Sequence, residues 1–183
     1  KKKEEEAKIQ EKKPERLEPL LHVDPMEIEV GYALVRLVDP AQNGPLLDKI
    51  SKIKRQVAVE LGIIVPPIRI RDNLQLEPNQ YVVKLRGVKI ASASVQPDQL
   101  LAMNPGTATG PISGGLPTKD PVFGIDAYWI PEQLQQQAES AGYTVVDSAT
   151  VMATHISEII KRHAADLLTR EEIEVWGALD GLP

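Results

Sequence analysis

Apolar residues recur at helical spacing in the clearest segment of the chain. Charged side chains such as Asp48 and Lys52 fall between them, so the segment predicts an amphipathic helix whose apolar stripe faces a core. Gly62 is well placed to end this helix, because glycine readily adopts the left-handed backbone of a helix C-terminus. The predicted stripe consists of Leu46, Ile50, Ile53, Val57 and Leu61.

The segments around this helix predict short strands and one further helix. The pattern indicates a strand over 27–30, a helix over 32–38 that ends at Asp39-Pro40, a strand over 63–71, and a hairpin of 81–85 with 88–95. Arg86-Gly87 supplies the turn of the hairpin. The order β-α-α-β-β implies a small mixed sheet flanked by helices, an α/β fold of the α+β kind.

A second compact unit follows a Gly/Pro/Thr-rich loop over residues 105–121. We expect there a strand over 123–130, a helix over 132–141, a strand over 143–146 and a helix over 149–168. Asp147 or Ser148 is the expected cap of that last helix, and Thr169 with Glu172 has capping-box spacing for one more. The buried stripe of the 149–168 helix is predicted to be Val151, Met152, Ile156, Ile159, Ile160 and Leu167.

Composition excludes several classes of function. A formal net charge of -5 argues against a general nucleic-acid binder, and the lack of cysteine excludes disulfides and thiolate metal sites. Residues 1–21 form a mixed-charge run that predicts a solvated linker. No apolar run approaches the ~20 residues of a membrane span. The chain starts without Met, so we expect a piece of a longer protein.

Templates for catalysis and metal binding fail along the chain. The Gly-rich stretch over 106–115 lacks the G-K-[ST] ending of a phosphate-binding loop, and no serine lies in a G-x-S-x-G elbow. His155 and His163 are two helical turns apart rather than the one turn that suits a chelating pair. With His22 they are expected to be structural or surface residues. We therefore predict a non-enzymatic binding or assembly module that needs no cofactor.

The segment Asp120-Pro121-Val122-Phe123-Gly124 stands out because it holds the only Phe of the chain. Packing preferences favour a buried Phe123 that nucleates the second unit, with Asp120 capping a turn. The alternative is a shallow apolar depression rimmed by a carboxylate, which would suit the docking of an amphipathic partner helix.

Four segments together carry a family resemblance: LAMNPGTATG, DPVFGIDAYWI, AGYTVVDSATVMATHISEII and RHAADLLTREE. From about Val23 to Glu172 the chain resembles the cytoplasmic part of the FHIPEP family of flagellar and type III secretion export-gate proteins. The resemblance implies a discontinuous first subdomain over 22–98 and 147–168, and an inserted second small α/β subdomain over 99–146. Residues 169–183 would start a truncated third subdomain or form a tail. Residues 1–21 would link the chain to a missing membrane half, at the cytoplasmic face of the bacterial inner membrane.

The resemblance also implies a function and a site. Family members form a nonameric ring below the export gate, and export chaperones with bound substrates dock in a hydrophobic dimple. Carried over by motif, Asp120 and Phe123 form one wall of the dimple and Thr154 faces them, while Val146 and Val151 line it further. The implied partners are these chaperones, other export-apparatus subunits including the ATPase complex, and further copies of the chain. No nucleic acid is implied, and the membrane is reached only through the missing half.

Two other functions stay open beside this docking role. One is a small hydrolase or transferase that uses His155 with Asp120, which requires the two side chains to converge in a deep cleft with a third polar partner. The other is a purely structural ring-assembly element, which requires Phe123 to be buried with no apolar depression beside it.

Overall fold

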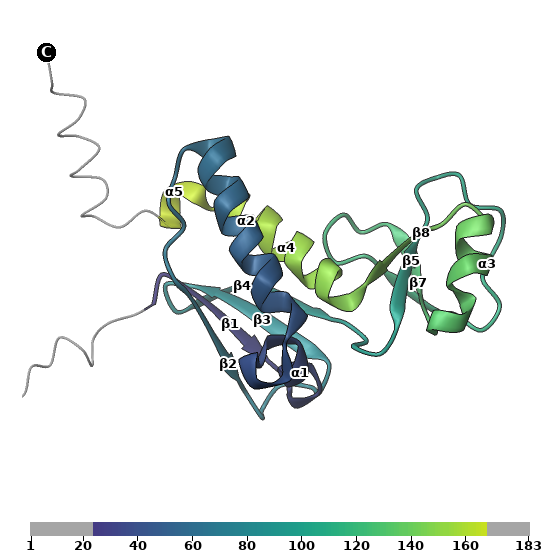
Figure 1. The fold of residues 1–183 in the computed structure, drawn as a ribbon, viewed down its shortest axis with the longest axis horizontal. Coiled ribbons are helices and arrows are strands. Elements are labelled where there is room, and N and C mark those ends of the chain that lie inside the picture. Colours follow the sequence, from purple (N-terminus) through teal and green to yellow (C-terminus); the bar gives the residue numbers. More distant parts are fainter. Residues whose placement is uncertain (1–23, 168–183) are drawn as a thin grey trace, which may run out of the picture.

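Two small sheets, each with helices packed against it, make up the described part of the chain. The computed structural model describes residues 24–167. Figure 1 shows one sheet with its covering helices in one lobe, and the second sheet with a short helix in the other lobe. The predicted α/β class is confirmed. The charged linker over residues 1–21 and the helix expected from Thr169 lie outside the described residues.

The first sheet has the strand order β2-β1-β3-β4. Its strands are β1 (Met26–Val30), β2 (Ile68–Asp72), β3 (Gln80–Leu85) and β4 (Val88–Ser94). β1 pairs parallel to β2 and antiparallel to β3, and β3 pairs antiparallel to β4. The predicted hairpin is confirmed, and positive φ angles at Arg86 and Gly87 give it a two-residue turn whose twist matches the strands. The strand predicted from Ile63 begins only at Ile68, after Pro66-Pro67, because proline restricts pairing.

Helices pack on one face of this sheet. They are η2 (Tyr32–Leu34), α1 (Val35–Val38), η3 (Pro40–Gln42), α2 (Pro45–Leu61), α4 (Ser148–Arg162) and α5 (Ala164–Leu167). The predicted stripe of α2 is buried except for Leu61, which is 46% exposed at the last position of the helix. The helix predicted over 149–168 divides at His163, which leaves helical geometry and caps α4. All six predicted core residues of that segment are nevertheless buried.

The second sheet has the order β6-β7-β5-β8 and is antiparallel throughout. Its elements are β5 (Leu100–Met103), β6 (Leu116–Lys119), β7 (Asp126–Ile130), η4 (Glu132–Leu134), α3 (Gln135–Ser140) and β8 (Thr144–Asp147). Sequence analysis missed β5 and β6, which are four residues each and lack an alternating pattern. The strand predicted from Phe123 was wrong at its start, because β7 begins at Asp126 and Phe123 lies in the preceding turn.

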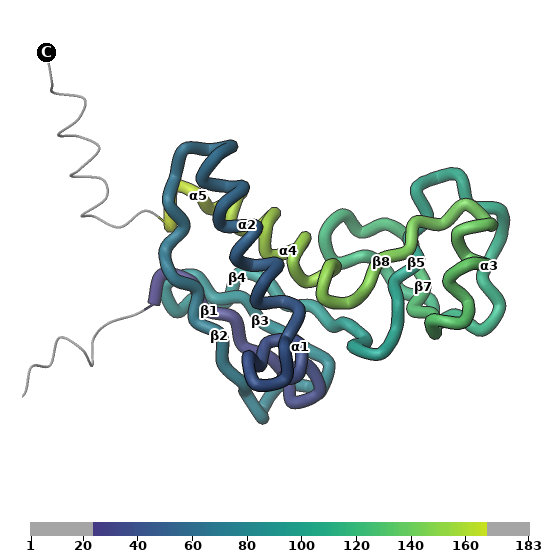
Figure 2. The backbone as a smooth tube through the Cα atoms, in the orientation of Figure 1, coloured from purple at the N-terminus to yellow at the C-terminus, as the bar shows by residue number. Residues whose placement is uncertain are grey.

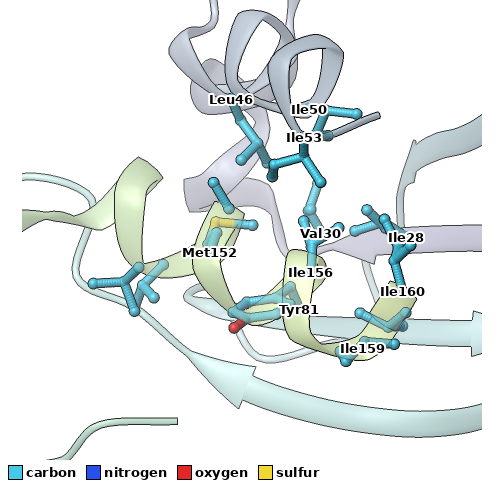
Figure 3. Packing of buried hydrophobic residues seen from close by; sticks show 14 of the residues in the cluster. Ile28, Val30, Leu46, Ile50, Ile53, Tyr81, Met152, Ile156, Ile159 and Ile160 are labelled. Atoms are coloured by element: carbon cyan, nitrogen blue, oxygen red, sulfur yellow. The ribbon is translucent and has the colours of Figure 1, made fainter. Parts of the chain in front are cut away.

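One hydrophobic core reaches from the first sheet into the second. Figure 3 shows side chains of α2, β1, β3 and α4 meeting in this core. The same cluster includes Leu101 of β5 and Trp129 of β7, while a smaller cluster lies between the second sheet and α3. The backbone trace shows β8 running directly into α4, which joins the two lobes (Figure 2). Within residues 24–167 no helix is both long and apolar enough to cross a membrane.

Candidate docking site

A small apolar pocket lies where the second sheet meets the start of α4. Its volume is about 60 Å³. All five site residues carried over from the resemblance line it: Asp120, Phe123, Val146, Val151 and Thr154. Met103, Val122 and Thr150 complete the lining, and we call this pocket the apolar dimple. Sequence reasoning missed these three, although Thr150 stands one helical turn before Thr154 and therefore shares its face of α4.

Phe123 is displayed on a tight turn rather than buried in the core. The residue is 62% exposed, so the expectation of a core Phe123 was wrong. The backbone N–H of Phe123 donates to Asp120 Oδ2 at 2.6 Å, and the N–H of Gly124 donates to the Asp120 carbonyl at 3.0 Å. Gly124 has a φ of 69°, a conformation that glycine adopts at little cost. The turn therefore places the Phe123 ring outside the sheet, where it lines the dimple.

Asp120 is the residue that organises this turn. It is only 4% exposed, and its backbone N–H donates to the carbonyl of Ile125 at 2.8 Å. Because the Asp120 carboxylate accepts the Phe123 N–H, the expectation that Asp120 caps a turn is confirmed. Removing the carboxylate would leave the Phe123 N–H without its acceptor, so the Phe123 backbone would no longer be held in its present position.

The opposite wall of the dimple is formed by the first two turns of α4. Asp147 caps this helix, as predicted, because its Oδ2 accepts from the Thr150 N–H at 3.2 Å and its Oδ1 pairs with the Thr150 hydroxyl at 2.5 Å. Burial works to raise the pKa of Asp147, but the hydrogen bonds from Thr150 outweigh it and leave the pKa lowered. Thr154 donates its hydroxyl to the Thr150 carbonyl at 2.8 Å. The cap thus fixes the position of both threonines.

His155 is buried beside Tyr81 and does not line the dimple. Its Nδ1 lies 2.6 Å from the Tyr81 hydroxyl, and the two rings meet edge to face. Burial lowers the pKa of His155, and the nearby Asp120 charge offsets this only in part. At Tyr81 burial and the Asp120 charge both raise the pKa. His155 is absent from the lining of the dimple, so the deep cleft that the hydrolase hypothesis requires with Asp120 is not formed there. Among residues 24–167 no three His, Cys, Asp or Glu side chains are grouped to hold a metal ion.

A family model and curated relatives assign the chain to the same family. The model described as "FHIPEP family" matches residues 1–179. The flagellar biosynthesis protein FlhA of Bacillus subtilis is 48% identical over 170 residues, which are 92% of this chain and 25% of the relative. The chain therefore spans about a quarter of the length of that curated relative.

Solved structures share the fold at low sequence identity. The structure described as the Chlamydia pneumoniae CdsV and CdsO protein complex matches with a TM-score of 0.67 and 20% identity, over 85% of this chain and 49% of that chain. The nonameric EPEC SctV-C structure matches with a TM-score of 0.55 and 14% identity, over 87% of this chain and 46% of that chain. At these identities the match concerns the fold alone.

Proposed function

The chain belongs to the FHIPEP family, and from this premise we propose that it acts in the flagellar protein export apparatus as a docking platform for chaperone–substrate complexes. The observation that carries the proposal is the exposed Phe123 beside the apolar dimple. Single exposed apolar side chains are common on protein surfaces, but Phe123 adjoins a pocket lined by further apolar side chains, and exposed apolar surface of this kind marks interaction sites. Its relatives named as flagellar biosynthesis proteins support the biological setting.

In the proposed mechanism an apolar side chain of the chaperone enters the dimple and packs against Phe123. Val146, Val151 and Met103 supply the apolar walls. A volume of about 60 Å³ suits the tip of a single side chain rather than a small-molecule ligand, whose sites usually exceed ~300 Å³. The exposed Thr154 offers a hydroxyl oxygen at the rim, while buried Asp120 acts mainly by holding the turn.

The proposal extends to organisation and assembly. We propose the first subdomain as residues 22–98 with 147–168, and the inserted second subdomain as residues 99–146, because the helices that cover the first sheet come from before and after the second sheet in the sequence. Copies of the chain within its longer protein would form a ring at the cytoplasmic face of the membrane, a proposal that the nonameric SctV-C relative in fold supports. Other export-apparatus subunits, including the ATPase complex, would be further partners.

Calorimetric titration of substrate-loaded flagellar export chaperones into the 183-residue chain tests the docking site. We expect Phe123→Ala to lose about 2 kcal/mol of binding free energy or more, which is roughly a thirtyfold rise in Kd. Leu74→Ala is the matched control, because Leu74 is also exposed, at 79%, but lies outside the dimple. Thermal stability should change little in both variants, since both side chains are on the surface.

Two results would count against the proposal. Equal binding by the wild type and Phe123→Ala would remove the dimple from the docking mechanism. A Phe123→Ala chain that unfolds at a much lower temperature than Leu74→Ala would favour the purely structural role.

A further inference from the structure

A groove between α2 and α4 adjoins the apolar dimple. Its volume is about 340 Å³, and it shares Thr150 and Thr154 with the dimple. The two depressions therefore meet at these threonines, and the dimple is the smaller and more apolar of the two.

The groove has the length and floor of a site for a helix. On α4 its wall runs through Thr150, Thr154, Glu158 and Lys161, which repeat every three or four residues and so lie in one row. At 1.5 Å of rise per residue this row is about 16 Å long, or three helical turns. Buried Ile53 and Ala153 form an apolar floor between the helices.

Three lysines line this groove although the chain as a whole carries a net charge of -5. Lys49, Lys52 and Lys161 line it, against Glu158 as the single acid. Lys161 Nζ already pairs with Glu60 Oε2 at 3.3 Å, and Lys49 helps to lower the pKa of Asp147. Lys52 is exposed and makes no ion pair with any residue of the described range 24–167. Lys52 is therefore the positive charge of this groove that is left to attract a carboxylate of a partner.

We propose that the α2–α4 groove is the second half of the docking site and holds an acidic amphipathic helix of the partner. The helix would place an apolar side chain in the dimple and direct carboxylates toward Lys52 and Lys49, one to two turns away. This inference rests on the proposed docking function and specifies the partner's chemistry. Charges at the rim of an interface act mainly on association rate and salt dependence. The groove would therefore speed the approach of the partner, and the partner's apolar side chain would then pack against Phe123 in the dimple.

Charge reversal at Lys52 tests the inference. Lys52→Glu is compared with Lys89→Glu, an identical charge change at an exposed position of β4 outside the groove. In titrations of the substrate-loaded chaperones at about 0.05 M salt, we expect Lys52→Glu to raise Kd about threefold to tenfold more than Lys89→Glu does. At about 0.5 M salt, where charges are screened within ~4–5 Å, the difference between the two variants should disappear.

A charge-swap series identifies the partner residue. Single Glu→Lys and Asp→Lys changes along the exposed helices of the chaperone should include one that restores the affinity of Lys52→Glu at low salt while weakening the wild type.

The outcomes separate the two proposals. If Phe123→Ala abolishes binding but Lys52→Glu behaves as Lys89→Glu at both salt concentrations, the dimple stands and the acidic-helix groove is wrong. If sedimentation shows that Lys52→Glu changes self-association instead of chaperone binding, the occupant is a second copy of the chain and the inference is overturned. If Phe123→Ala binds as the wild type does, the docking function itself fails and the groove proposal falls with it.

Discussion

At the scale of single residues, two buried carboxylates hold different parts of the molecule. Asp120 fixes the turn that exposes Phe123. Glu29, in the central strand β1, is 3% exposed on the face of the first sheet opposite to Ile28 and Val30. It accepts from Lys84 Nζ at 2.7 Å, from Asn73 Nδ2 at 3.0 Å and from Arg71 Nη2 at 3.2 Å. These bonds tie β2 and β3 to β1.

Glu29 should make the unfolding free energy depend on pH between about 4.5 and 2. Its hydrogen bonds, that from Lys84 first, lower its pKa from 4.5 to about 2. A lowered folded-state pKa means that the unfolded chain binds the proton first, so this stabilisation is complete above pH 4.5 and is lost as the pH falls toward 2. Glu29→Gln should cost about 2 kcal/mol at neutral pH, and the difference from the wild type should narrow over that range.

Urea unfolding at a series of pH values checks this prediction. Glu132→Gln, at an exposed position of η4, is the matched control and should leave the pH profile of the wild type unchanged. A difference between the wild type and Glu29→Gln that stays constant from neutral pH to pH 2 would contradict the assigned pKa.

At the scale of elements, α4 connects the core to the candidate site. One face of the helix carries Met152, Ile156 and Ile160, which are fully buried. Another face carries Thr150 and Thr154, which line both the dimple and the groove. The start of α4 therefore determines stability and the shape of the site together, and Asp147 determines where the helix starts.

Removing the cap of α4 should weaken the fold by a modest and recognisable amount. Asp147→Ala leaves the Thr150 N–H without its side-chain acceptor, at a cost of about 1 kcal/mol. Asp147→Asn keeps an acceptor of equal capping quality and should cost much less. Chemical denaturation measures both, and an Asp147→Asn variant as unstable as Asp147→Ala would show that the charge matters more than the cap.

At the scale of the whole molecule, the two sheets share one core. Leu101 and Trp129 of the second sheet belong to the same buried cluster as Ile28 and Met152. Such continuity couples the lobes, because exposing one side of the cluster also removes packing from the other. The same junction forms the dimple, so a stable site depends on both lobes staying together.

We expect the chain to unfold in one cooperative transition. Trp176→Phe leaves Trp129 as the single Trp, whose fluorescence reports on the second sheet. Far-UV circular dichroism and this fluorescence should give coincident urea transitions. Met152→Ala should shift both together by about 2–5 kcal/mol, since Met152 is fully buried. Fluorescence that changes at a lower urea concentration than circular dichroism would show that the second sheet unfolds by itself.

Several elements followed from the sequence because their signals are local. The apolar stripe of α2, the Arg86-Gly87 turn and the Asp147 cap depend on residues within a few positions of one another. The family resemblance also named five residues that the structure brings around one pocket. Residue pattern alone did not give that site, because its walls come from β5, the turn after Asp120 and α4, which are far apart along the chain.

The sequence by itself determined the fold class, the main helices and the large apolar side chains that α4 buries, because hydrophobic periodicity and capping act over one or two turns. Only the tertiary structure decided which apolar residues stay outside. Phe123 is exposed on the Asp120 turn before β7, and Leu61 is exposed at the last position of α2. The tertiary structure alone also defined β5 and β6, whose four-residue segments become strands through the partners β7 and β8. Burial and strand pairing depend on neighbours that are distant in sequence, and a local pattern does not contain them.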